Sequence, residues 1–206
     1  MAPCSSHKPA SWQRGPKWQA TSFQHNQLPK HLSAWLLDQG SLTQKLVERS
    51  QGRLRVKVLQ QRIQAARLSE YKALAQPVHS KRSSAKPTSK PIAFNTRRWA
   101  VVREVVLYGN DVPWVYARTI IPLLTLKGSL RRLHYLGNKP LGGALFADPS
   151  MRRQGLELAE ITTQDLPPNA QSLHASKGSI WGRRSLFFLK NKPLLVCEVF
   201  LEKLIK

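Results

Sequence analysis

Two pairs of long apolar segments, each divided by a short turn signal, constrain the fold of this chain most strongly. Residues 99–108 (WAVVREVVLY) and 112–122 (VPWVYARTIIP) flank Gly109-Asn110-Asp111, and residues 180–201 contain a second pair divided at Asn191-Lys192. Segments rich in Val, Ile and aromatic residues around such turns are typical of β-hairpins. Hairpin strands are antiparallel, so the second half of the chain predicts an antiparallel sheet.

Shorter elements complete the predicted domain. Residues 30–50 predict two short helices separated by Gly40, with a capping-box spacing at Ser41 and Gln44. Residues 53–60 alternate apolar and basic side chains, which indicates a half-buried strand, and residues 61–76 have helical composition. Together with the hairpins and a strand near 156–163, this makes at least six strands separated by short helices. The pattern predicts an α+β fold with a single antiparallel sheet.

Composition divides the 206 residues unevenly. Residues 1–28 have few aliphatic side chains and predict a disordered basic tail. Residues 29–206 form the predicted domain, with a basic flexible insertion at about 62–96. The formal net charge is +22, and only three of the eleven acidic residues lie in the first 98. Such a charge is compatible with weak contact of the tail with anionic membrane or nucleic acid, although a solvated basic tail and loop is the simpler and favoured explanation.

The cysteines and histidines exclude several kinds of site. Cys4 and Cys197 are too few for a disulfide framework, which favours a reducing compartment. No apolar run is long enough for a spanning helix, and the N-terminus lacks an apolar signal core, so we expect a cytoplasmic protein. The six histidines show no metal-ligand spacing, and residues 137–143 (GNKPLGG) are not a phosphate-binding loop. The residues therefore indicate neither a metal site nor a phosphate-binding loop.

Two arginines lie among apolar residues in the first predicted hairpin. If Gly109-Asn110 is a two-residue turn, Arg103 and Arg118 share one face of the sheet as diagonal neighbours. Two neighbouring guanidinium groups repel each other unless an anion lies between them, and arginine matches a carboxylate with two donors. The hairpin therefore predicts a pocket for a small anion with one or two carboxylates. For each arginine alone, a structural ion pair or a solvated strand edge is equally compatible.

An acid in the last apolar segment also requires an explanation. Glu198 lies in PLLVCEVFL, and an isolated carboxylate removed from water costs several kcal/mol. A turn at Asn191-Lys192 places Ser185 opposite Glu198 and Arg183 diagonal to it, so a structural pair with Arg183 is one interpretation. The other is a carboxyl group in a pocket that acts as a general acid or base or binds a hydroxyl.

The segments that stand out physically also resemble a known family. In the same order along the chain, they are similar to the signature segments of bacterial chorismate lyase (chorismate pyruvate-lyase). The similar segments are WLLDQGSLT (35–43), REVVLYGNDVPWVYARTIIP (103–122), LGNKPLGGALF (136–146), WGRRS (181–185) and KPLLVCEVFL (192–201).

The resemblance implies a fold and an activity. It implies a monomeric domain in which a six-stranded antiparallel sheet and helical flaps enclose the site. The implied reaction removes pyruvate from chorismate and leaves 4-hydroxybenzoate, the first committed step toward ubiquinone, with neither metal nor organic cofactor. Apart from this substrate and product, no obligate partner is implied.

The resemblance also assigns roles to individual residues. It implies that Arg103 holds the ring carboxylate, together with the backbone at Leu42 and Leu141. Glu198 contacts the ring oxygen and is the candidate catalytic residue. Arg118 corresponds to a second arginine that faces the enolpyruvyl carboxylate. Position 42 often has Met in the family, a difference without consequence for a backbone contact.

Two other functions stay open from sequence. The first is a non-catalytic effector domain of the same fold, which binds a small carboxylate in a transcription regulator. Residues 1–98 lack the three-helix pattern of an upstream winged-helix domain. The second is a basic nucleic-acid-binding protein, for which no helix-turn-helix or RNP-like pattern is present.

Overall fold

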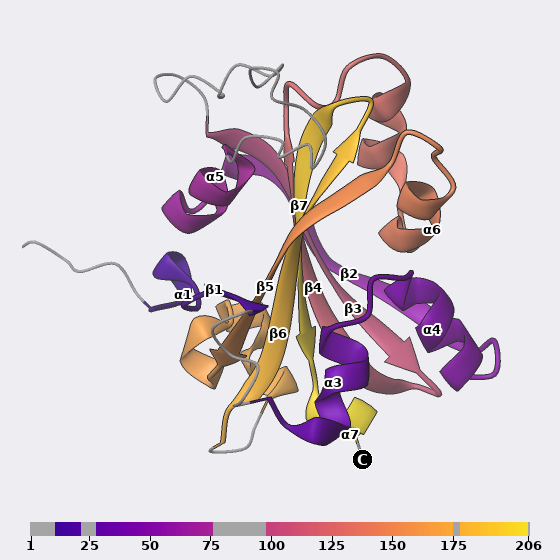
Figure 1. The fold of residues 1–206 in the computed structure, drawn as a ribbon, viewed down its shortest axis with the longest axis vertical. Coiled ribbons are helices and arrows are strands. Elements are labelled where there is room, and N and C mark those ends of the chain that lie inside the picture. Colours follow the sequence, from indigo (N-terminus) through magenta and orange to yellow (C-terminus); the bar gives the residue numbers. More distant parts are fainter. Residues whose placement is uncertain (1–10, 22–27, 76–97, 175–177, 206) are drawn as a thin grey trace, which may run out of the picture.

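The sheet forms the centre of the molecule. The computed structural model describes residues 11–21, 28–75, 98–174 and 178–205. Within them, one antiparallel sheet has the strand order β1-β5-β6-β7-β4-β3-β2 (Figure 1). The α+β class and the single antiparallel sheet are confirmed. Six strands are long, as predicted, and β1 adds a two-residue seventh: β1 Gln19–Ala20, β2 Leu54–Ala65, β3 Trp99–Gly109, β4 Val112–Pro122, β5 Arg152–Ile161, β6 Ile180–Leu189 and β7 Lys192–Phe200.

Short helices pack on both faces of the sheet (Figure 1). The α-helices are α1 Ser11–Arg14, α3 Lys30–Leu36, α4 Leu42–Arg49, α5 Leu68–Leu74, α6 Leu141–Phe146 and α7 Glu202–Ile205. There are also three 3₁₀ segments in the described ranges: η1 Gly128–Tyr135, η2 Thr163–Asp165 and η3 Pro168–Leu173. None of the helices in the described ranges is long and apolar enough to cross a membrane.

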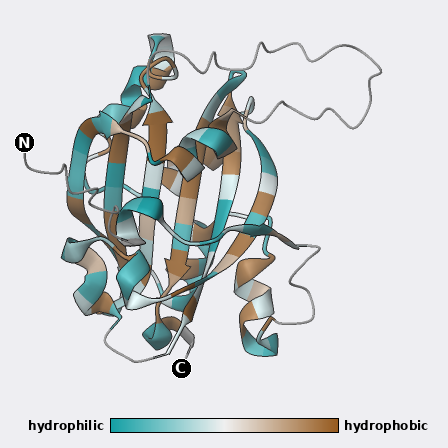
Figure 2. Cartoon of the chain, turned by 90° about the vertical axis from the view of Figure 1, so that its left-hand side faces the viewer, coloured by the Kyte–Doolittle hydropathy of each residue, from teal (hydrophilic) through white to brown (hydrophobic). Residues whose placement is uncertain are grey.

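The period-two alternation of the strands gives the sheet two apolar faces. On one, which we call the front face, the side chains of Val105 and Ala117 pack against α3 and α4, and Phe187 packs against η1 and α6. On the opposite, back face, Ile120 and Leu195 pack against α5. Figure 2 shows hydrophobic residues along the long strands, interrupted by hydrophilic bands. Both faces are therefore covered, and a polar side chain on either one is taken out of water.

Both hairpin turns lie one residue away from their predicted positions. Asn110 and Asp111 have φ of 52° and 62°, and Lys190 and Asn191 have φ of 49° and 62°. Two successive positive φ values define the turn type that matches the twist of hairpin strands. Asn and Asp tolerate this conformation through local hydrogen bonds, so they rather than Gly109 occupy the first turn.

The predicted helix at 61–76 is wrong in its first half. β2 continues to Ala65 and pairs with β3 along its whole length, with a register shift between Val58 and Gln60. This β-bulge interrupts the alternation of apolar side chains after Val58, which is why the continuation of the strand was missed. The two helices predicted in residues 30–50 are confirmed as α3 and α4.

The predicted domain boundaries also need correction. Residues 11–21, assigned to a disordered tail of 28 residues, form α1 and β1, and Trp18 packs against the back face. The predicted insertion at 62–96 overlaps the end of β2 and the whole of α5. The remainder of both predicted segments, residues 1–10, 22–27 and 76–96, lies outside the described residues.

Candidate active site

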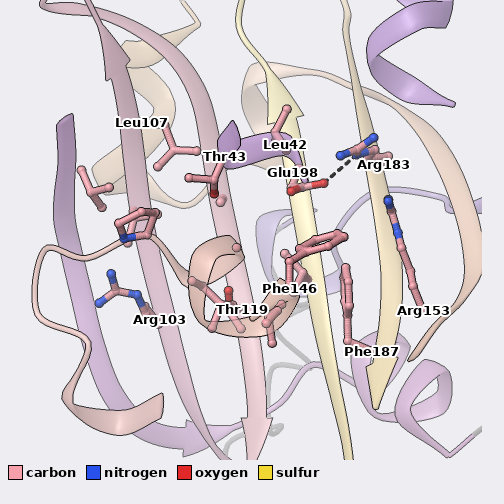
Figure 3. A pocket seen from close by; sticks show the side chains of 18 of the residues that line it. Leu42, Thr43, Arg103, Leu107, Thr119, Phe146, Arg153, Arg183, Phe187 and Glu198 are labelled. Atoms are coloured by element: carbon pink, nitrogen blue, oxygen red, sulfur yellow. Dashed lines mark hydrogen bonds and ion pairs between the residues drawn. The ribbon is translucent and has the colours of Figure 1, made fainter. Parts of the chain in front are cut away.

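A pocket lies between the front face and the first turns of α4 and α6. Each of five strands contributes a polar or charged side chain to it, namely β3, β4, β7, β6 and β5. The two helices cover it (Figure 3). Its lining includes Thr43, Arg103, Thr119, Gly142, Arg153, Arg183, Phe187 and Glu198.

The cover depends on close contact between two helices. Ser41 caps α4, because its Oγ accepts a hydrogen bond from the Gln44 backbone N–H at 3.3 Å, which confirms the predicted N-cap. In α6, Gly142 lies against Thr43 of α4, so that a Cβ added to Gly142 would be 2.3 Å from Thr43 Oγ1. The missing side chain allows the two helices to meet over the pocket.

Arg103 is a buried cation without a nearby acid. Its side chain is on the front face and the residue is 2% exposed. Nη1 donates to Gln61 Oε1 at 3.1 Å, and Nη2 donates to the Lys139 carbonyl oxygen at 3.2 Å. Within the described part of the chain no carboxylate pairs with it, and burial lowers the pKa of its guanidinium. An anionic ligand at this position would restore the favourable interaction that the charge loses on leaving water.

Glu198 combines the two interpretations that the sequence left open. It lies directly opposite Arg183, not diagonal to it, because the second turn is at Lys190-Asn191. Arg183 Nε donates to Glu198 Oε2 at 2.6 Å, so the structural ion pair exists. Glu198 also lines the pocket, with its side chain 16% exposed. Because the ion pair uses Oε2, Oε1 can still meet a ligand.

Arg183 fixes the orientation of Glu198. It is 1% exposed, and its Nη1 donates to the carbonyl oxygens of Trp35 at 2.7 Å and Asp38 at 2.8 Å. These carbonyls lie at the C-terminal end of α3 and just beyond it. A single guanidinium therefore connects β6, β7 and the end of α3, and holds the acid in place.

Arg153 is a pocket residue that sequence reasoning missed. Its Nε donates to Ser185 Oγ and its Nη1 to the Asp38 carbonyl oxygen, both at 3.0 Å, and its guanidinium lies over the Phe187 ring. A register shift between Gln154 and Glu157 disturbs the alternation along β5, so the sequence pattern did not indicate which way Arg153 points.

Leu42 and Leu141 lie where the resemblance implied. Each is the first residue of a helix, of α4 and α6 respectively, and each lines the pocket. The backbone N–H of a first helical residue has no partner within the helix. The structure thus brings Leu42, Leu141, Arg103 and Glu198 to one pocket.

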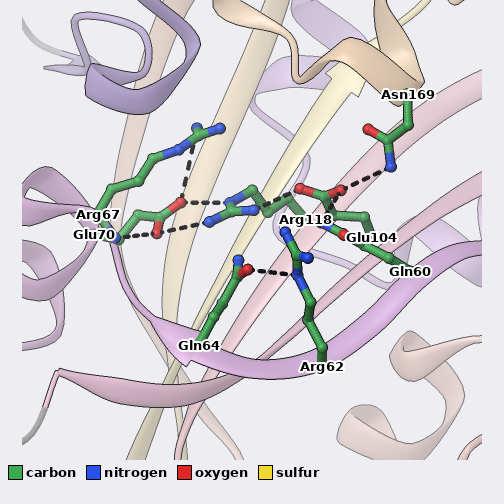
Figure 4. A network of polar contacts seen from close by, with 8 residues as sticks. All are labelled: Gln60, Arg62, Gln64, Arg67, Glu70, Glu104, Arg118 and Asn169. Atoms are coloured by element: carbon green, nitrogen blue, oxygen red, sulfur yellow. Dashed lines mark hydrogen bonds and ion pairs between the residues drawn. The ribbon is translucent and has the colours of Figure 1, made fainter. Parts of the chain in front are cut away.

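Arg118 does not belong to this group, and the predicted shared face is wrong. A bulge between Leu107 and Tyr108 puts Arg103 opposite Thr119 and Glu104 opposite Arg118. Arg118 therefore points to the back face. There its Nε donates to Glu70 Oε1 at 2.7 Å, and its Nη1 donates to Glu104 Oε1 at 2.5 Å (Figure 4).

The network around Arg118 is compensated within the protein. Glu104 also accepts from Gln60 Nε2 at 2.6 Å and from Asn169 Nδ2 at 3.3 Å, and Glu70 accepts from the Arg67 backbone N–H at 2.8 Å. Burial disfavours the charge of Arg118, but Glu70 and Glu104 more than offset this and raise its pKa. Arg118 is thus a structural cation, separated from the pocket by the sheet.

Metal chemistry has no obvious place in the described ranges. Across residues 11–21, 28–75, 98–174 and 178–205, no group of three or more His, Cys, Asp or Glu side chains could hold a metal ion. Cys197 is buried on the back face, and burial raises the pKa of its thiol to about 12, which makes it a poor nucleophile.

Comparisons with known proteins show what this chain is similar to. The family model described as chorismate lyase matches residues 10–205. A protein named "Probable chorismate pyruvate-lyase" from Methylococcus capsulatus is 35% identical over 170 residues, which cover 82% of this chain and 94% of that protein. A protein of the same name from Psychromonas ingrahamii is 38% identical over 180 residues, covering 84% and 83% respectively.

Among solved structures, PhnF from Mycobacterium smegmatis has a similar fold. The TM-score is 0.50 at 12% sequence identity, and the match covers 82% of this chain and 67% of that one. At this identity the likeness extends to the fold alone.

The contact between α4 and α6 makes a first prediction. Gly142→Ala should force Thr43 away and separate the two helices, lowering the thermal midpoint by several degrees and accelerating amide hydrogen exchange in both. Gly143→Ala is the matched control, because its added Cβ meets nothing within 4 Å. Equal behaviour of the two variants would contradict the proposed close contact.

The back-face network makes a second prediction, about stability and pH. Burial alone raises the pKa of the Glu70 carboxyl, but Arg118 and Arg67 more than offset it, so the pKa lies below its ordinary value of 4.5. A lowered folded-state pKa stabilises the protein above the unfolded pKa, and this contribution is lost as pH falls from about 5 through the folded pKa. Glu70→Gln should lower the free energy of unfolding by about 3–5 kcal/mol at pH 7. It should also weaken the loss of stability between pH 5 and pH 3.

Urea unfolding of both proteins between pH 3 and pH 7 measures this difference. The exposed Glu160→Gln substitution in β5 is the control and should change stability by less than about 0.5 kcal/mol. If the free energy of unfolding of Glu70→Gln falls with acid as steeply as that of the unchanged protein, Glu70 is not the source of the pH dependence.

Proposed function

The chain belongs to the chorismate lyase family and is therefore an enzyme; we propose that it eliminates pyruvate from chorismate and releases 4-hydroxybenzoate. The observation that carries the proposal is the pairing of an uncompensated cation with an acid in one covered pocket. Arg103 on β3 and Glu198 on β7 both line it, two strands apart. Two strand spacings are about 10 Å, and side chains that converge from this separation suit the carboxylate and para-hydroxyl of one ring.

In the proposed complex, Arg103 binds the ring carboxylate. Gln61 and the Lys139 carbonyl hold its guanidinium in position, and burial strengthens its interaction with an anion. The backbone N–H groups at Leu42 and Leu141 donate to the same carboxylate. Support comes from their place at the start of α4 and α6 on the pocket, and from the family resemblance.

The chemistry requires one base and a leaving group. The bond between ring carbon 3 and the enolpyruvyl oxygen breaks, and carbon 4, which bears the hydroxyl, loses its proton. The electron pair of this C–H bond completes the aromatic ring. The released enolpyruvate takes up a proton at its methylene carbon and becomes pyruvate. Glu198 is placed to accept the proton or to hold the hydroxyl oxygen, and Arg183 keeps its carboxylate oriented.

A covered site has a consequence for turnover. The product retains the ring carboxylate and the hydroxyl, so it keeps the proposed contacts to Arg103 and Glu198. Release then requires α4 and α6 to separate, and we expect product dissociation to limit the rate. On the family resemblance we place the reaction as the first committed step toward ubiquinone, in a monomeric cytoplasmic enzyme that uses no cofactor.

The two alternative functions have less support. The likeness to PhnF concerns the fold alone, and an effector domain does not need an acid beside the ring hydroxyl. Nucleic-acid binding rests on net charge, and several of the arginines that contribute to it are buried in ion pairs, among them Arg118 and Arg183. Weak contact of the basic residues 1–28 with membrane or nucleic acid stays a prediction.

Incubation of the purified protein with chorismate tests the proposed activity. We expect equimolar 4-hydroxybenzoate and pyruvate, measured by chromatography, with unchanged rates after treatment with a metal chelator. A folded protein that leaves chorismate intact would overturn the proposed function.

Substitution of the two ends of the pocket tests the assignment of roles. Arg103→Ala should raise KM and weaken 4-hydroxybenzoate binding by about 100-fold, because it removes a charge-assisted contact in a buried site. Glu198→Gln should lower kcat by about 100- to 1,000-fold with a smaller effect on binding. An unchanged kcat in Glu198→Gln would point to proton transfer within the substrate. Because Glu198→Gln leaves Arg183 without its acid, thermal midpoints must accompany the kinetics.

A further inference from the structure

Chorismate carries a second carboxylate, on the enolpyruvyl group, and the structure removes Arg118 from the residues that could bind it. We propose that Arg153 binds this carboxylate through its Nη2 group. The inference rests on the proposed function and extends it, because it names the group that distinguishes the substrate from the product.

The first observation is an unused donor. Nε and Nη1 of Arg153 donate to Ser185 Oγ and the Asp38 carbonyl, which fixes the plane of the guanidinium. Nη2 is buried and has no hydrogen-bond partner. A buried donor left unsatisfied costs about 1–3 kcal/mol, and native structures rarely keep one without a reason. Because Arg153 lines the pocket, a ligand oxygen can supply the missing acceptor.

The second observation is the charge balance of the pocket. Among the described pocket residues, Arg183 is paired with Glu198, whereas Arg103 and Arg153 have no ion pair. Two uncompensated guanidinium groups thus remain, on opposite sides of the pocket (Figure 3). A ligand with two separated carboxylates neutralises both, whereas 4-hydroxybenzoate neutralises one.

The third observation is the position of Arg153 relative to Glu198. The Asp38 carbonyl accepts from both Arg153 and Arg183, and Arg183 donates to Glu198. The Arg153 guanidinium therefore lies next to the ion pair that contains the acid (Figure 3). In chorismate the enolpyruvyl ether is on the carbon adjacent to the one that bears the hydroxyl. With the hydroxyl at Glu198, the enolpyruvyl carboxylate lies at the Glu198 end of the pocket, the end to which Arg153 belongs.

Arg183 is less suited to the same task. Its Nε and Nη1 are already used by Glu198 and by two backbone carbonyls, and it is 1% exposed. A carboxylate that drew Arg183 toward itself would also draw it from Glu198. Arg153 has a fixed plane and a free donor, so it gains a bond without breaking one.

The experiment compares a ligand that carries the second carboxylate with one that lacks it. Arg153→Gln should raise KM for chorismate about 10- to 100-fold, because a charge-assisted hydrogen bond is lost. Its dissociation constant for 4-hydroxybenzoate, measured by calorimetry, should change less than about twofold. Arg153→Lys keeps the charge but not the fork of donors, and should recover part of the loss.

The neighbouring Arg152→Gln is the matched control, because Arg152 is exposed and contacts Asn191 at the surface. It should leave both constants unchanged. If Arg153 had only a structural role, Arg153→Gln would lower the thermal midpoint and weaken the binding of both ligands equally. That result would overturn the proposal. An unchanged KM in a folded Arg153→Gln variant would overturn it as well. Failure of the unchanged protein to convert chorismate is a separate outcome, which refutes the proposed function itself.

Discussion

The antiparallel pairing of β4 with β7 holds the rest of the structure together. It joins the two hairpins into one sheet and sets Arg118 beside Cys197 and Ala117 beside Glu198. Because successive side chains point to opposite faces, this register sends Glu198 to the front and Arg118 to the back. A slip of one residue in this pairing would put Glu198 opposite Arg118, so that both would point to the same face of the sheet.

The two faces of the sheet differ in how their buried arginines are paired. On the back face, Arg118 is paired with Glu70 and Glu104, so its charge is compensated within the protein. On the front face only Arg183 is paired, and burial lowers the pKa of both Arg103 and Arg153. The front face is therefore electrostatically incomplete without an anion. This difference supports the front face as the location of the proposed chemistry.

Much of the fold was predictable from local pattern, and the errors have a common cause. The hairpins, α3, α4 and the antiparallel sheet followed from alternation and capping signals in short windows of sequence. Most wrong statements concerned β-bulges in β2, β3 and β5; both hairpin turns were also displaced by one residue, and residues 11–21 were assigned to a disordered tail. A bulge inserts one residue into a strand and is decided by the fit of both strands to their neighbours, so it leaves little trace in a single segment.

The class of fold, the family resemblance and the choice of Arg103 and Glu198 as candidate site residues came from the sequence, because a charged residue in an apolar strand is visible without coordinates. Only the tertiary structure decided which arginines share their pocket. Arg103 and Arg118 are neighbours in one hairpin yet lie on opposite faces. Arg153 comes from a distant strand, and the Asp38 carbonyl and Arg183 link it to Glu198. The physical reason is that strand register has a period of two residues, so a single bulge exchanges one face for the other.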